Sequence, residues 1–323
     1  MKTIKYIVRS LLSLLLIVSA AFLLSEASSL SSTVTYEQPS FISDIDVNSK
    51  TVEKPVKILF IGDIFLDRYI RQVSMQNGED YPFSCVDQLL HSADIVVGNL
   101  EGPITTNPSR SIGSEIGSPE NYVFTFPTSS AATLKRHNIT IVTIGNNHIT
   151  NFGIGGLHET QKYLTAAGVH YFGGVKGNEP IYRMKNISFV SFNQFGGQSF
   201  EDVAAIIAGE HLKGQTVIVF AHWGDEYSQS IRTTEEIAQS FVISGANLII
   251  GSHPHIVIPR TDIGEVPVYY SLGNFIFDQY WNEEVTTGLA VMAEISGKNI
   301  VIEEYTVSLK PDGRTCFDAH VLK

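Results

Sequence analysis

Polar side chains that can bind metal ions follow five apolar runs of the chain, each at the point where the run ends. Imidazole together with carboxylate and amide oxygen suits Zn, Mn, Fe or a similar divalent ion, whereas pure Ca or Mg sites use oxygen ligands alone. The sequence therefore predicts a transition-metal centre assembled from separate segments. The candidate residues are Asp63, Asn99 and Glu101 in GNLEG, Asn146, Asn147 and His148 in GNNH, His222 in AHWGDE, and His253 and His255 in GSHPH.

Most of these segments also have an ordinary structural interpretation. Asp63 can be a turn residue or a helix cap, and Asn146-Asn147 can form a left-handed turn. Glu101 can cap local backbone. His222 follows a strongly apolar strand, so a hydrogen-bonded core histidine is the alternative there. We favour the metal centre because these alternatives would have to hold independently at five strand ends.

The segment His253-Pro254-His255 gives the strongest single indication of ligation. It follows the apolar run LIIG directly, and the proline stiffens it. In an extended segment, residues i and i+2 point the same way, so both imidazoles are expected to face one ion.

Continuous apolar strands alternate with amphipathic helices from residue 56 to residue 255, which predicts a layered α/β fold. Alternating strands with turns follow, so a mixed sheet or two stacked sheets are expected. Ligands of α/β sheets bind beyond the carboxyl ends of the strands, where the five segments can converge. The expected helices cover residues 65–76, 83–93, 129–138, 155–168, 200–209 and 233–245.

The N-terminal segment has the composition of an export signal. Lys2, Lys5 and Arg9 precede an apolar run over 11–24, and either a cleaved signal peptide or a retained membrane anchor fits. We expect residues 1–27 to be that segment, 28–55 a disordered spacer, and 56–323 one domain. The domain is then membrane-anchored facing outside, or secreted or periplasmic. The long connection over 102–122 is expected to lie over the site or to be mobile.

Composition narrows the class of partner. The chain carries 33 acidic and 22 basic residues, a formal net charge of -11, and its basic residues are not clustered. Nucleic acid is therefore excluded as an expected partner. The two cysteines, Cys85 and Cys316, are too few for a disulfide-rich scaffold or a cysteine zinc site. Their spacing leaves open whether they pair.

Six motifs in order carry a family resemblance: GDIFLDR, VVGNLEGPIT, TIGNNHITNFG, VFAHWGDEY, GSHPHIV and YYSLGNFIFD. Together they resemble the CapA family of capsule-synthesis proteins of poly-γ-glutamate biosynthesis, which is similar in fold to the calcineurin-like metallophosphoesterases. The resemblance runs from about residue 57 to residue 285. It implies a four-layer α/β/β/α sandwich with mixed sheets.

The resemblance also implies roles for residues. His148 falls where that superfamily keeps a general acid, and Asn99 is an alternative to Glu101 at the bridging position. One or two Mn, Zn or Fe ions are implied. The implied metal ligands are Asp63, Glu101, Asn147, His222, His253 and His255.

One position departs from the phosphoesterase pattern. The first motif of that superfamily reads Asp-x-His, but Phe65 stands at the third position here. A ligand is therefore missing, which allows one metal or a distorted second site. Asp67 can compensate, or it can pair with Arg71 one helical turn on.

The implied function is metal-dependent hydrolysis or transfer at a phosphoester or an amide. The alternative is a non-catalytic subunit or polymer-binding scaffold of a capsule export machine. Expected partners are an anionic polymer or phosphoester substrate and membrane-bound capsule-synthesis or export subunits. A phosphate cradle at residues 153–156 is the other option, but a turn and helix start is the favoured explanation of those glycines.

Overall fold

A computed structural model of the chain describes residues 54–322, with side chains placed up to Phe317. The expected export segment, and nearly all of the expected spacer, lie outside the described residues. No helix within the described part is both long and apolar enough to cross a membrane.

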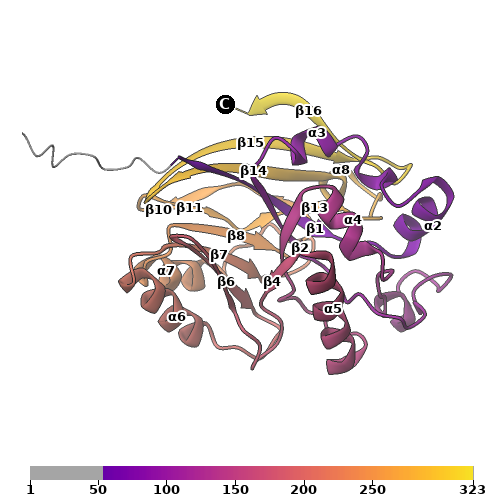
Figure 1. The fold of residues 1–323 in the computed structure, drawn as a ribbon, viewed down its shortest axis with the longest axis horizontal. Helices are drawn as coiled ribbons and strands as arrows, with labels where there is room; N and C mark the ends of the chain where they lie inside the picture. The colour runs from indigo at the N-terminus through magenta and orange to yellow at the C-terminus, as the bar shows by residue number, and fades with distance from the viewer. Residues whose placement is uncertain (1–53, 323) are drawn as a thin grey trace, which may run out of the picture. The chain divides into compact units, whose positions relative to one another are not determined.

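Two mixed sheets form the body of the described domain (Figure 1). In the first sheet, parallel pairing links β1 to β2, β3 and β4, and an antiparallel ladder adds three C-terminal strands on the other side of β1. Its order is β16 (Thr315–Leu322), β15 (Asn299–Leu309), β14 (Thr287–Ser296), β1 (Val56–Ile64), β2 (Ile95–Leu100), β3 (Ile139–Thr143) and β4 (His170–Phe172), with β13 (Asn274–Ile276) beside β1.

The second sheet has a parallel centre and antiparallel edge strands. Its order is β10 (Thr261–Ile263), β11 (Val266–Tyr269), β8 (Leu248–Ser252), β7 (Thr216–His222), β6 (Ile187–Asn193) and β5 (Ile181–Met184). A short pair, β9 (Val257–Ile258) and β12 (Ser271–Leu272), lies apart from both sheets.

Helices cover the outer faces of the sheets, as Figure 1 shows for α5 on one side and α6 and α7 on the other. The helices are α2 (Arg68–Asn77), α3 (Asp87–Leu90), α4 (Ser130–Arg136), α5 (Gly153–Ala167), α6 (Phe200–Leu212), α7 (Glu235–Ile243) and α8 (Glu283–Thr286), with 3-10 turns η1 (Tyr81–Phe83) and η2 (Pro119–Tyr122).

Three apolar cores separate four layers. Alternate residues of β1 point to opposite faces, so Phe60 packs between the two sheets while Leu59 packs under the helices of the first sheet. A third core joins the second sheet to α6 and α7, for example through Val219 and Phe241. The predicted α/β sandwich with mixed sheets is thereby confirmed.

One expected helix is largely absent. Residues 83–93 were predicted to form a single amphipathic helix, but only Asp87–Leu90 is α-helical there. The chain instead turns through η1, and Ser84 is held by its backbone and side-chain bonds to the carbonyl of Tyr81. Cys85 lies between the two helical pieces and is tied to a distant strand.

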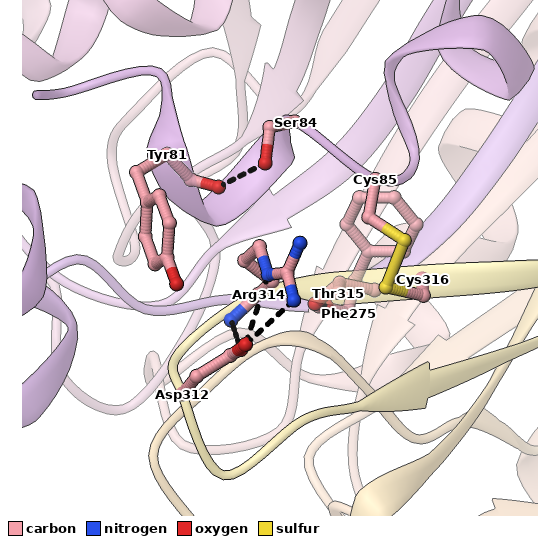
Figure 2. The surroundings of a disulfide bond; sticks show 8 residues. All are labelled: Tyr81, Ser84, Cys85, Phe275, Asp312, Arg314, Thr315 and Cys316. Atoms are coloured by element: carbon pink, nitrogen blue, oxygen red, sulfur yellow. Dashed lines mark hydrogen bonds and ion pairs between the residues drawn. A yellow bond between two sulfur atoms is a disulfide. The ribbon is translucent and has the colours of Figure 1, made fainter. Parts of the chain in front are cut away.

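Cys85 and Cys316 form a disulfide, with their Cα atoms 4.7 Å apart and 231 positions between them in sequence (Figure 2). Further contacts hold the start of β16 beside the disulfide. Arg314 pairs with Asp312 at 2.7 Å, and the Thr315 hydroxyl donates to the carbonyl of Phe275. The disulfide therefore fastens the edge strand β16 to the segment between η1 and α3, and settles a pairing that spacing alone left open.

Gly62 sits where β1 meets a neighbouring backbone, immediately before Asp63. A methyl group added there would lie 1.9 Å from the carbonyl oxygen of Gly273, which cannot swing away as a side chain would. We expect Gly62→Ala to destabilise the domain by about 3 kcal/mol or more, measured by urea unfolding. The control is Gly209→Ala in α6, where nothing lies within 4 Å of the added atom. This control substitution should stabilise the domain by about 0.5–1 kcal/mol. Equal urea midpoints for the two variants would contradict the close approach of Gly62 to the Gly273 carbonyl.

Candidate metal centre

The carboxyl ends of both sheets bring the predicted residues together. In the first sheet Asp63 is paired with Asn99, and in the second His222 is paired with Ser252. All four residues are buried. Because side chains at equivalent ends of parallel strands share one edge, the two sheets present their polar groups to a common space.

Glu101, His222 and His253 form the tightest cluster. One ligand atom from each lies within 4.8 Å of the others, and His222 Nε2 is 3.5 Å from Glu101 Oε1. The rings of His222 and His253 have centroids 4.7 Å apart. Glu101 Oε1 and His253 Nδ1 are buried without a hydrogen-bond partner among the described residues. Buried polar atoms are rarely left unpaired, so a bound ion fits this donor set.

The electrostatics of the cluster fit the same interpretation. Burial raises the pKa of the Glu101 carboxyl well above its usual range, and the charge of Asp63 raises it further. Burial also lowers the pKa of His222 well below its ordinary value and, together with His255, that of His253 to about 4. The imidazoles are thus neutral near pH 7, so each has one nitrogen with a lone pair, while Glu101 needs a nearby cation to ionise.

Asp63 and His255 form a second group beside the cluster. Their Oδ2 and Nδ1 atoms are 3.2 Å apart, and Asn274 Oδ1 is 3.0 Å from the same nitrogen. Asn99 joins the two groups, because its amide donates to Asp63 Oδ1 at 2.8 Å and also to Glu101 Oε2. The Asn99 amide therefore holds both carboxylates, whichever of them contacts an ion.

The sequence predicted an extended segment from which His253 and His255 face one ion, and that conformation was wrong. The segment is not extended: His253 has φ 97° and His255 has φ 59°. Non-glycine residues are rarely found in this left-handed region, and such strain concentrates at functional sites. Tertiary contacts hold it here, including the bond from the His253 N–H to Asp63 Oδ2 at 3.4 Å.

Polar neighbours orient His222. Its Nδ1 is 3.0 Å from Ser252 Oγ, which leaves Nε2 facing Asn147 Oδ1 at 2.9 Å. Partners of this kind fix the tautomer of metal-binding histidines. Asn147 is thus within the cluster, whereas Asn146 contacts it only through Asn99, donating to that side chain and to the carbonyl of Leu100. Ser252 was not predicted from the sequence, although its place one residue before His253 at a strand end is the same signal.

His148 lies at the edge of the centre rather than inside the cluster. Its ring packs against Phe124 with centroids 4.5 Å apart, and it is half-buried. Burial, and to a smaller extent the charge of His255, lowers the pKa of His148 to about 3. The imidazole is therefore neutral near pH 7, and a bound anion is needed to raise its pKa before it can donate a proton.

Phe65 and Asp67 have structural surroundings. Phe65 is fully buried and stacks on Phe277 with ring centroids 4.6 Å apart. Asp67 pairs with Arg71 at 2.7 Å and accepts a hydrogen bond from Ser111 at 3.0 Å. Asp67 thus anchors the 102–122 connection and does not replace the missing ligand.

The fold and the centre define an α/β/β/α sandwich protein with a histidine- and carboxylate-rich centre at the strand ends. The chain belongs to the family described as bacterial capsule synthesis protein PGA_cap, whose model matches residues 57–195 and 197–279. The CapA resemblance of the sequence motifs is therefore confirmed.

Two curated relatives are similar to this chain. The PGA biosynthesis protein CapA of Bacillus subtilis (strain 168) is 28% identical over 246 residues, which cover 69% of this chain and 63% of the relative. The capsule biosynthesis protein CapA of Bacillus anthracis is 27% identical over 258 residues, covering 71% and 61%. The chain thus matches less than two thirds of the length of each relative.

Proposed function

We propose that this CapA-like chain is an exported, metal-dependent hydrolase or transferase of capsule biosynthesis. The observation that carries the proposal is the buried cluster of Glu101, His222 and His253, in which two ligand atoms have no other partner among the described residues. Asp63, His255 and Asn147 complete the proposed ligand set for one or two Mn, Zn or Fe ions. A bound ion would supply Lewis-acid polarisation of a phosphoryl or carbonyl oxygen.

The residues have distinct proposed tasks. Ser252 and Asn274 orient His222 and His255, and Asn99 holds the carboxylates of Asp63 and Glu101. His148 is proposed to protonate the leaving group once the substrate's anionic charge lies beside it.

The disulfide supports an extracytoplasmic location. Disulfides persist in oxidising compartments and are rare where thiols are kept reduced. The expected export signal before residue 28 agrees with this proposal. Membrane-bound synthesis or export subunits are the proposed partners. An amide of a γ-linked anionic polymer is the first proposed substrate, because one relative is named for PGA biosynthesis, and a phosphoester is the second.

The decisive test is turnover by His148→Asn in metal-loaded protein. Cleavage of poly-γ-glutamate, read as a shift in chain length, and hydrolysis of p-nitrophenyl phosphoesters are compared with wild type. We expect turnover to fall by about 10²–10⁴-fold, the usual value of general acid catalysis, with metal content unchanged. The control is His91→Asn, since His91 is half exposed and pairs with Asp87. Unchanged turnover in His148→Asn would overturn its proposed role.

A non-catalytic scaffold is the second candidate, and Phe65 at the place of a ligand favours it. The same assays separate the two functions. Wild-type protein that binds metal and polymer but turns over neither substrate would favour the scaffold.

A further inference from the structure

A cavity of about 470 Å³ opens beside the metal centre. Four exposed aromatic side chains stand on its wall: Tyr69 is 36%, Tyr122 51%, Tyr227 44% and Trp281 60% exposed. The rings of Tyr227 and Trp281 meet edge to face with centroids 5.4 Å apart. Large aromatic side chains exposed to solvent around a cavity indicate a ligand that covers them.

Hydrogen bonds connect this cavity to the centre. The Gln279 amide donates to the Tyr227 hydroxyl at 2.9 Å, and its carbonyl accepts from Asn274 at 3.0 Å. Asn274 in turn contacts His255 Nδ1. The Tyr227 ring also lies 5.8 Å from the ring of His255. A ligand in the cavity therefore lies next to whatever occupies the centre.

Backbone strain marks the same wall. Tyr227 has φ 56° and Arg68 has φ 47°, both in the left-handed region that favours glycine. The Arg68 guanidinium lies 4.3 Å from the centre of the Phe65 ring and is held by Asp278. Two strained residues at one cavity indicate positions fixed for binding.

The charges of the cavity exclude simple anion capture. Arg68 is the cation on its wall, and Asp278 accepts from two of its nitrogens at 3.0 and 2.6 Å. Nη1 of Arg68 already donates to Asn121. The guanidinium is thus neutralised and engaged, and the chain as a whole carries a formal charge of -11. The part of a ligand that enters here is expected to be uncharged.

We propose that the cavity binds a ring of a neutral saccharide beside the metal centre. The apolar face of a sugar ring stacks on Trp281 or Tyr122, and its hydroxyl groups bond to the amide and hydroxyl side chains between them. Those side chains are Gln72, Ser111, Ser114, Asn121 and Gln279. This inference goes beyond the proposed function and does not depend on turnover.

Trp281 is a built-in reporter for the experiment. The chain has two tryptophans, and Trp223 is fully buried. The full chain, with and without loaded metal, is titrated with maltotetraose, cellotetraose and chitotetraose while fluorescence is recorded. We expect at least one of the three to change Trp281 emission saturably below about 1 mM, an ordinary range for small ligands.

Variants separate stacking from a general effect on the fold. By calorimetric titration, Trp281→Phe should keep the affinity within about threefold, whereas Trp281→Leu should weaken it at least about tenfold. Ile243→Ala, an exposed apolar residue on α7, is the control and should bind as wild type. The proposal would be overturned if none of the saccharides bound at concentrations up to about 10 mM. Saturable quenching of Trp281 by oligo-γ-glutamate instead of a saccharide would also overturn it. Metal content, measured in the same samples, reports separately on the centre.

Discussion

Purified without chelator, the chain should carry about one to two transition-metal ions, and His253→Ala should lose them. His253 Nδ1 is buried without a partner among the described residues, and the ring lies against that of His222. Removing this imidazole leaves two of the three residues of the tightest cluster, Glu101 and His222. We expect metal affinity to fall by more than the 10–100-fold typical of supporting residues. Elemental analysis of protein reconstituted with Mn, Zn or Fe measures the effect.

Graded variants make this prediction sharper. Glu101→Gln keeps the shape but not the charge and should also lose metal. Ser252→Ala removes only the hydroxyl beside His222 Nδ1, so its affinity should fall by about 10–100-fold. His91→Ala, outside the centre, should keep full occupancy. Wild-type protein that stays free of metal after reconstitution would show that the cluster binds no ion.

The sequence predicted that these polar side chains converge because parallel strands carry their polar ends to one edge. Asp63, His222 and His253 each follow an apolar run, and that pattern alone brought them together. It could not show which residues share an ion. The division into a Glu101 cluster and an Asp63 group depends on how two sheets face each other, and strand periodicity contains no information about that distance.

Local conformation was also beyond the sequence pattern. The left-handed backbone of His253 and His255 is imposed by tertiary contacts against local preference, so the extended segment expected from the sequence does not form. The short α3 is a similar case. Residues 83–93 have helical spacing, but a bond from Cys85 to Cys316, 231 positions away, lies in the turn at the start of this segment.

The cavity beside the centre was only partly visible in the sequence. The 102–122 connection was expected over the site because of its length, and seven of its residues, between Ser111 and Tyr122, line the cavity. What sets its position is Asp67, buried and bonded to Ser111, a contact that crosses 44 positions of the chain. Trp281 also lines the cavity, although it lies far from this connection in the sequence. No rule of residue spacing could have placed the two together.

Loss of the disulfide should lower stability strongly while leaving the metal centre intact. A cross-link that closes a loop of 231 residues removes about 5 kcal/mol of unfolded-state entropy in the chain-entropy model, and native bridges usually contribute about 2–5 kcal/mol. For a domain of this size that corresponds to a melting temperature lower by roughly 5–15 °C. The double variant Cys85→Ser/Cys316→Ser, melted beside wild type with and without dithiothreitol, measures it.

The position of the bridge explains why stability and metal binding should separate. It fastens β16, the edge strand, and two strands lie between β16 and β1, which carries Asp63. Opening that edge exposes β15 without moving the carboxyl ends of β1, β2, β7 or β8. Metal content should therefore stay at the wild-type value at 25 °C, and dithiothreitol should lower the melting temperature of wild type only. A double variant that melts with wild type would show that the packing around Thr315 and Arg314 suffices to hold the strand.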